Sequence, residues 1–93
     1  MRPPLYSQTF LRIFKRLDRQ RQRAAIEAVQ TLSIHLEERS HLPIGLGLKK
    51  VAKAYWQIRT SLADRIIFEW QDDQIIFRLI GSHDDVRRFL RQV

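Results

Sequence analysis

The stretch from Tyr55 to His83 limits what this 93-residue chain can fold into more than any other part of the sequence. It holds three short runs rich in Ile, Phe, Trp and Tyr, a composition typical of β-strands. Asp72 and Asp73 stand between the second and third runs, and a polar pair in this position favours a tight turn. The stretch therefore predicts three antiparallel strands joined by two turns.

The turn between the second and third strands determines which residues of that hairpin face each other. A two-residue loop pairs Phe68 with Phe77 and Ile66 with Leu79, which makes one face of the hairpin apolar. The first turn, near Ser61, must then have an odd length, because a slip of one residue moves every side chain to the other face. We expect one buried group on the apolar face, made of Trp56, Ile58, Ile66, Phe68, Phe77 and Leu79.

Three arginines share the opposite face in this register. Arg59 falls opposite Arg65, and Arg78 lies on the neighbouring strand. Like charges that face each other directly destabilise a sheet. Either carboxylates such as Glu69 and Asp64 neutralise these arginines, or the face is built to hold an anion.

The charge of the chain favours particular partners. It contains 17 Lys and Arg against 10 Asp and Glu, with a formal charge of +7 and a pI near 10.8. This balance favours a polyanionic partner, meaning nucleic acid, an acidic protein or both. The length corresponds to one domain, residues 1–93.

Nothing in the sequence predicts a membrane protein. No apolar run approaches the ~20 residues of a membrane span, and the residues after Met1 lack the apolar segment of a signal peptide. The chain has no cysteine, which is compatible with a reducing compartment. We therefore expect a cytoplasmic protein with no membrane partner.

Two helices are predicted before the strands. Ser7 is a good N-cap for a helix with apolar residues at the spacing i, i+3, i+4, i+7, and Asp18 reads as the cap of a second helix that ends near Glu38. The apolar stripe of the second helix is Ala25, Ile26, Val29, Leu32, Ser33 and Leu36. With almost no connector, the two helices form an αα-hairpin that can cover the apolar sheet face.

A last helix is predicted after the strands. Ser82 and Asp85 have the spacing of a capping box, which places His83 in the first turn. The hairpin register pairs Arg65 with Ile80, three residues before His83. The arginine face and the start of this helix should therefore meet.

Sequence motifs for cofactors are missing. In the loop from Arg39 to Leu48, Gly45 and Gly47 are not followed by GK[ST] and form no GxGxxG, so we reject a phosphate loop. The aspartate pairs belong to a turn and to a helix start rather than to a set with metal-ligand spacing. We expect no cofactor and no metal.

The order of these elements resembles the RelE/ParE superfamily of toxins from type II toxin–antitoxin systems, with an ending most similar to its RelE- and YafQ-like branch. The segments that carry the resemblance are Leu48-Lys49-Lys50-Val51, Ile58-Arg59, Asp64-Arg65-Ile66-Ile67-Phe68, the Asp72-Asp73 turn and Gly81-Ser82-His83-Asp84-Asp85-Val86. The resemblance implies an α+β fold with an N-terminal αα-hairpin packed on a small, mostly antiparallel sheet and a C-terminal helix.

The resemblance also implies a function and a site. Ribonuclease members cut messenger RNA on the ribosome without metal, and a cognate antitoxin protein blocks their basic groove. The residues that match by position as catalytic are His83, Arg65, Arg59 and Lys50, and those expected to bind substrate are Lys49, Lys53, Tyr55, Asp64 and Arg78. Histidine, arginine and lysine are residue types that suit this reaction, because cleavage of RNA through its own 2′-hydroxyl needs proton transfer and cations around the phosphate.

Two other functions stay open. The ParE branch of the same superfamily inhibits DNA gyrase and cuts nothing. A non-catalytic nucleic-acid-binding module would also suit the charge, with Tyr55 available for stacking. The chain departs from YafQ-like toxins in having Arg59 or Thr60 where a second strand histidine is expected. His83 together with Lys50 favours the ribonuclease.

Overall fold

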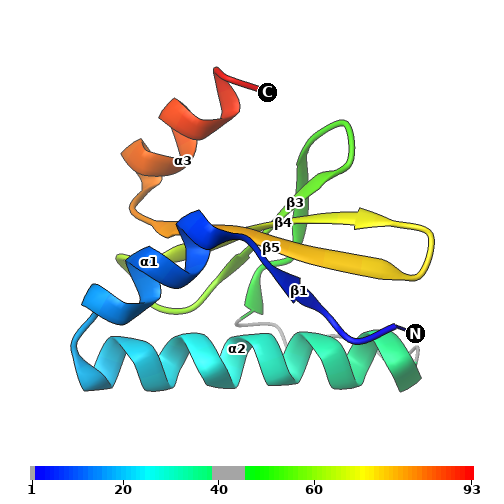
Figure 1. Cartoon of the computed structure of the whole chain (residues 1–93), viewed down its shortest axis with the longest axis horizontal. Helices are drawn as coiled ribbons and strands as arrows, with labels where there is room; N and C mark the ends of the chain where they lie inside the picture. Colours follow the sequence, from blue (N-terminus) through cyan, green and yellow to red (C-terminus); the bar gives the residue numbers. More distant parts are fainter. Residues whose placement is uncertain (1, 39–45) are drawn as a thin grey trace.

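The computed structural model describes residues 2–38 and 46–93, which form a five-stranded sheet with helices on both faces (Figure 1). The helices are α1 (Gln8–Arg16), α2 (Arg19–Glu38) and α3 (His83–Leu90). The strands are β1 (Leu5–Tyr6), β2 (Lys49–Ala52), β3 (Tyr55–Arg59), β4 (Arg65–Gln71) and β5 (Gln74–Gly81). They lie in the order β1-β5-β4-β3-β2, with only β1 parallel to its neighbour. The predicted α+β fold is confirmed.

The predicted helix starts are also confirmed. The hydroxyl of Ser7 accepts a hydrogen bond from the Phe10 backbone N–H at 3.1 Å, and the carboxylate of Asp18 accepts one from the Arg21 N–H at 2.8 Å. Ser82 and Asp85 form both bonds of a capping box. Most of the predicted loop before β2, residues 39–45, lies outside the described residues.

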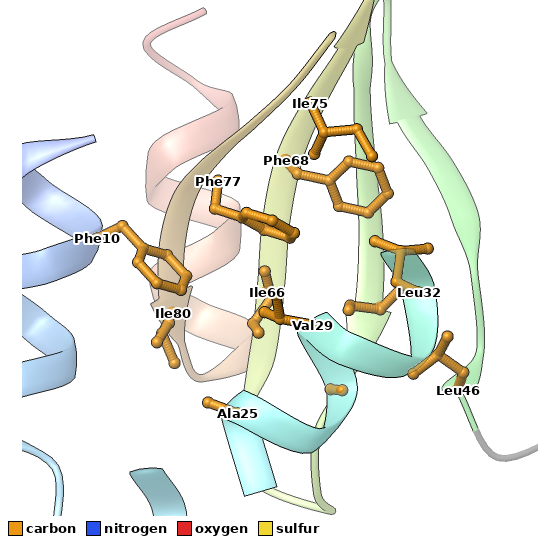
Figure 2. Packing of buried hydrophobic residues seen from close by; sticks show 12 residues of the cluster. Phe10, Ala25, Val29, Leu32, Leu46, Ile66, Phe68, Ile75, Phe77 and Ile80 are labelled. Carbon is orange, nitrogen blue, oxygen red and sulfur yellow. The ribbon is translucent and has the colours of Figure 1, made fainter. Parts of the chain in front are cut away.

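The main core fills the space between the sheet and the helices α1 and α2 (Figure 2). Phe77 stands near its centre, with its ring centroid 5.8 Å from those of both Phe10 and Phe68. The buried members are Phe10, Ala25, Ala28, Val29, Leu32, Leu46, Ile58, Ile66, Phe68, Ile75, Phe77 and Ile80. The sheet face predicted to be apolar is therefore the face that α2 covers.

One residue of the predicted α2 stripe is misplaced. Ile26 is 46% exposed, whereas Ala28 is buried. The buried side of α2 is centred on Ala25, Val29 and Leu32, so the next position after Ala25 turns about 100° away from the sheet.

The register between β3 and β4 is as predicted. Ile58 pairs with Ile66 and Trp56 with Phe68 on the α2 side, and Arg59 faces Arg65. The connecting turn runs from residue 60 to residue 64, which is an odd length. Parity alone was enough here because no residue interrupts the alternation of either strand.

The predicted register between β4 and β5 is correct from the Asp72-Asp73 turn as far as the pair of Phe68 and Phe77. Beyond that pair, Ile67 faces Leu79 and Arg65 faces Gly81, which leaves Arg78 without a partner in a β-bulge. The predicted pairs of Ile66 with Leu79 and of Arg65 with Ile80 are therefore wrong by one residue.

The bulge at Arg78 of β5 lies beside the point where β1 ends and α1 begins. The Ser7 backbone N–H donates to the Phe77 carbonyl at 2.9 Å, and the Ser7 hydroxyl donates to the Arg78 carbonyl at 3.1 Å. As a result Ile80 joins the main core, while Leu79 turns to the other face of the sheet. There Leu79 packs with Ile67 and with Val86 of α3 in a second, smaller cluster. The prediction that Leu79 belongs to the main core was wrong for this reason.

Within the described part of the chain, no helix is both long enough and apolar enough to cross a membrane.

Candidate functional site

Arg59 and Arg65 face each other across β3 and β4 on the sheet face that carries α3. Arg59 is exposed and Arg65 is half-buried. Among the described side chains, no carboxylate forms an ion pair with either arginine. The stem of Arg59 lies along Gly47, which has a positive φ of 61° and whose added Cβ would come within 3.4 Å of the Arg59 Nε. Two like charges therefore meet at one end of the sheet, with no compensating carboxylate among the side chains that the structure describes.

Asp64, one of the two carboxylates that could neutralise these arginines, is engaged elsewhere. Its two oxygens each accept a hydrogen bond of 2.8 Å from the guanidinium of Arg21 on α2, and its side chain is only 4% exposed. These hydrogen bonds raise the pKa of Arg21 above its ordinary value. The Asp64 backbone N–H also donates to the Ser61 hydroxyl at 3.0 Å. Asp64 thus fastens the β3–β4 turn to α2, and its carboxylate points away from the position expected for a substrate-binding residue.

Glu69, the other carboxylate, neutralises the third arginine. Its Oε1 lies 2.9 Å from the Nε of Arg78, and the Glu69 side chain is 17% exposed. Tyr55 pairs with Glu69 across the strands. The Tyr55 ring packs against the Phe89 ring of α3 in a T-shaped arrangement, with the ring centroids 5.6 Å apart. Two of the residues expected to bind substrate, Arg78 and Tyr55, are therefore held by partners within the protein.

His83 is the first residue of α3 and is exposed. Its distance from the arginine pair is set by Gly81, which faces Arg65 and precedes His83 by two residues. Gly81 has to be a glycine, because an added Cβ would lie 2.6 Å from the Asp85 Cβ. Within residues 2–38 and 46–93, no hydrogen bond or ion pair restrains the His83 ring.

The start of α3 is held by Asp85 rather than by the histidine. The Asp85 carboxylate accepts hydrogen bonds from the Ser82 backbone N–H and hydroxyl, each at 2.9 Å, and it pairs with Arg88. The bonds from Ser82 lower the pKa of Asp85 below its ordinary value, and Arg88 lowers it further. The helix start that carries His83 is therefore well anchored while the imidazole itself is accessible.

The two lysines of β2 lie on opposite faces of the sheet. Lys49 faces Gln57, which shares a side with Arg59, whereas Lys50 faces Trp56. The Nζ of Lys50 lies 6.0 Å from the Trp56 ring centroid. Lys50, expected to act with the arginines, is thus on the α2 side, and Lys53 stands in the β2–β3 turn.

The structure therefore brings Lys49, Arg59 and Arg65 to one face, and His83 lies two residues after Gly81, the residue that faces Arg65. We call these four residues the basic face. Strand alternation would have indicated that Lys49, rather than Lys50, shares a face with the arginines. That inference requires the β2–β3 register, which the sequence does not reveal. The Arg21–Asp64 pair spans 43 residues and left no signal in the sequence. Among the described residues, no group of three or more His, Asp and Glu is placed to hold a metal ion.

The described chain has the fold of the RelE/ParE-like toxins. YafQ from E. coli strain BL21(DE3) matches with a TM-score of 0.67 and 18% identity, over 92% of this chain and 98% of that one. A chain of the RelB–RelE antitoxin–toxin complex from Methanococcus jannaschii matches with a TM-score of 0.66 and 22% identity, over 91% of this chain and 96% of that one. A chain of the YoeB–YefM complex from Staphylococcus aureus matches with a TM-score of 0.64 and 14% identity, over 89% of this chain and 98% of that one. No protein-family model matches the sequence, and no curated protein does.

Proposed function

We propose that this chain is the toxin of a type II toxin–antitoxin system and that it cleaves messenger RNA on the ribosome. The observation that supports this most is the pair of Arg59 and Arg65, which no described carboxylate neutralises. The accessible His83 follows two residues after the strand position that faces Arg65, in a toxin fold. Opposed like charges cost stability, so a face that keeps them without a carboxylate is suited to bind an anion. A phosphodiester is such an anion.

The chemistry follows from what RNA itself supplies. The 2′-hydroxyl oxygen attacks the adjacent phosphorus, the bond from phosphorus to the 5′-oxygen breaks, and a 2′,3′-cyclic phosphate and a 5′-hydroxyl result. One proton leaves the 2′-oxygen and one reaches the 5′-oxygen. His83 carries out one of these transfers, a role that contributes typically ~10²–10⁴-fold.

The arginines stabilise the charge that develops on the phosphate oxygens. Positioned positive groups of this kind usually supply the largest single contribution to such a reaction. Arg59 and Arg65 hold the scissile phosphate, and Lys49 takes the place that Lys50 was expected to fill, because Lys49 shares their face. Asp64 acts through Arg21 by holding the turn between the two arginine strands.

We further propose an antitoxin partner that covers the basic face with an acidic segment. The neighbours include RelB–RelE, DinJ–YafQ and YoeB–YefM complexes, and this chain carries a charge of +7. Long-range attraction is screened over about 10 Å at ~0.1 M salt. Added salt should therefore slow association more than it speeds dissociation.

The direct test replaces His83 with glutamine. His83→Gln should fold and bind the antitoxin normally, and it should lose ribosome-dependent cleavage by about 100-fold or more. Arg87→Gln is the matched control, because Arg87 is an exposed residue of the same helix. A His83→Gln protein that cleaves at the wild-type rate would overturn the assignment. If it also remains toxic and inhibits DNA gyrase, the ParE-like function replaces this one.

A further inference from the structure

We infer that this protein has a second nucleic-acid contact, a pocket for one unstacked base, on the α2 side of the sheet. A cavity of about 360 Å³ lies there, lined by Lys50, Lys53, Trp56, Trp70 and Asp72. The basic face carries Arg59 and Arg65 on the opposite side of the sheet. The inference therefore stands independently of any cleavage by the chain.

The aromatic wall of the pocket follows from the strand register. Trp56 pairs with Phe68, and Trp70 lies two residues beyond Phe68, so both indoles project from the same sheet face. Their ring centroids are 5.5 Å apart, with the planes inclined by 59°. Both rings are half-buried and pack against the main core, and both also line the cavity. Indole faces of this kind stack on bases of any identity, because every base has a π-face.

The cations stand at the rim of the same pocket. The Nζ of Lys50 lies 6.0 Å from the Trp56 ring centroid, at the outer limit of a cation–π contact. Lys53 stands in the β2–β3 turn and is exposed. Neither lysine forms an ion pair with a described carboxylate, including Asp72 on the same rim. Both ammonium groups are therefore free to meet the phosphates that flank a stacked base.

Asp72 completes the pocket at the β4–β5 turn. It adopts a left-handed backbone with φ 55°, a conformation that aspartate tolerates better than most residues. Its carboxylate provides an acceptor for an N–H group of a base. Stacking walls, an acceptor and two flanking cations together fit a nucleotide within a single strand better than an inorganic anion, which would use only the lysines.

Both tryptophans of the protein line this pocket, so tryptophan fluorescence, excited selectively above the tyrosine absorption, reports on it. The probe is a single-stranded DNA octamer, which lacks the 2′-hydroxyl and so resists the proposed cleavage. It should quench the fluorescence in a saturable way, whereas inorganic polyphosphate should not. Arg87→Gln should leave this quenching unchanged, because Arg87 is an exposed residue of α3, on the other face of the sheet.

Substitutions separate stacking from charge, with binding followed by the anisotropy of a labelled octamer. Trp70→Leu should weaken binding about 10-fold, within the range for one stacked base. Trp70→Phe, which keeps a ring, should stay within about 3-fold and covers the case in which Trp70→Leu fails to fold. Lys53→Gln should reduce the salt dependence of log K by about 0.7, whereas Lys15→Gln on α1 should leave it unchanged.

Three results would overturn the inference. Binding of the octamer without quenching would place it elsewhere on the protein. Equal quenching by polyphosphate would reduce the pocket to a general anion site. Quenching by the antitoxin but by no oligonucleotide would identify the pocket as a protein-docking surface.

Discussion

The two faces of the sheet differ in how much of each is covered. The α2 face lies under a 20-residue helix, and the residues of β3, β4 and β5 that point to it form the main core. The α3 face lies under a helix of 8 residues (Figure 1), and its buried cluster consists of Ile67, Leu79 and Val86. Arg59 remains exposed on that side. One face therefore supplies most of the stability, and the other has room for charges that reduce it.

The boundary between the two faces is set by the bulge at Arg78. Without the extra residue, Leu79 would enter the main core and Ile80 would lie under α3. The bulge also brings Gly81, in place of Ile80, opposite Arg65. That single shift moves His83 one residue closer to the arginines than a regular hairpin would.

The largest expected effect compares two neighbours that point to opposite faces. Ile66 and Ile67 are both fully buried. Ile66→Ala should lower the free energy of unfolding by about 4 kcal/mol and Ile67→Ala by about 2 kcal/mol, within the range for Ile→Ala in a core. The smaller value follows because α3 is short and can move toward the cavity. Urea denaturation of both variants measures the difference, and equal losses would contradict the division between faces.

The next effect concerns the ion pair that joins α2 to the β3–β4 turn. Arg21→Ala should lower the free energy of unfolding by about 3 kcal/mol, because it leaves the buried Asp64 carboxylate without its partner. Arg23→Ala, at an exposed position of the same helix, should change it by less than about 0.5 kcal/mol. Thermal unfolding of the two variants checks this. Similar stabilities would show that the pair contributes nothing to the fold.

A smaller effect concerns the start of α3 and depends on pH. The pKa of Asp85 is lowered in the folded protein, so its contribution is present above the unfolded value of about 4 and is lost as the pH falls through the folded one. Asp85→Asn should cost about 0.5–1 kcal/mol at pH 7, the low end for a helix cap. The stability gap between wild type and variant should close toward pH 2.

The matched control is Asp84→Asn at an exposed position of the same turn. Its stability difference from wild type should be smaller at pH 7, because the Asp84 side chain forms no hydrogen bond or ion pair within residues 2–38 and 46–93. If the difference in unfolding free energy between wild type and Asp85→Asn stays constant between pH 7 and pH 2, the charge of Asp85 does not stabilise the start of α3.

The sequence was sufficient for the three helices together with β3, β4 and β5, and for the β3–β4 register. Alternation and turn length determine both, and they are local properties. The β4–β5 register failed at Arg78 because the bulge is stabilised by Ser7, 71 residues away in the chain. Ile26 was misplaced for a related reason, since apolar spacing does not say which side of a helix meets the sheet.

The candidate site was predictable only in part. Residue types and spacing indicated His83, Arg59 and Arg65. They could not separate Lys49 from Lys50, which depends on the β2 register and its irregularity after Lys50. The ion-pair partners of Asp64 and Arg78 could not be predicted from the sequence either. Several arginines and carboxylates are available to each, and tertiary packing decides which of them form a pair.

The central claim is that the arginine pair serves function at the expense of stability. The measurement that tests it most directly is Arg65→Gln, assayed for both unfolding and ribosome-dependent cleavage. Removing one of two opposed like charges should leave the free energy of unfolding unchanged or raise it by up to about 1 kcal/mol. Cleavage should fall by about 100-fold or more, as for loss of a charge-stabilising group. A variant that is less stable and cleaves normally would contradict the account.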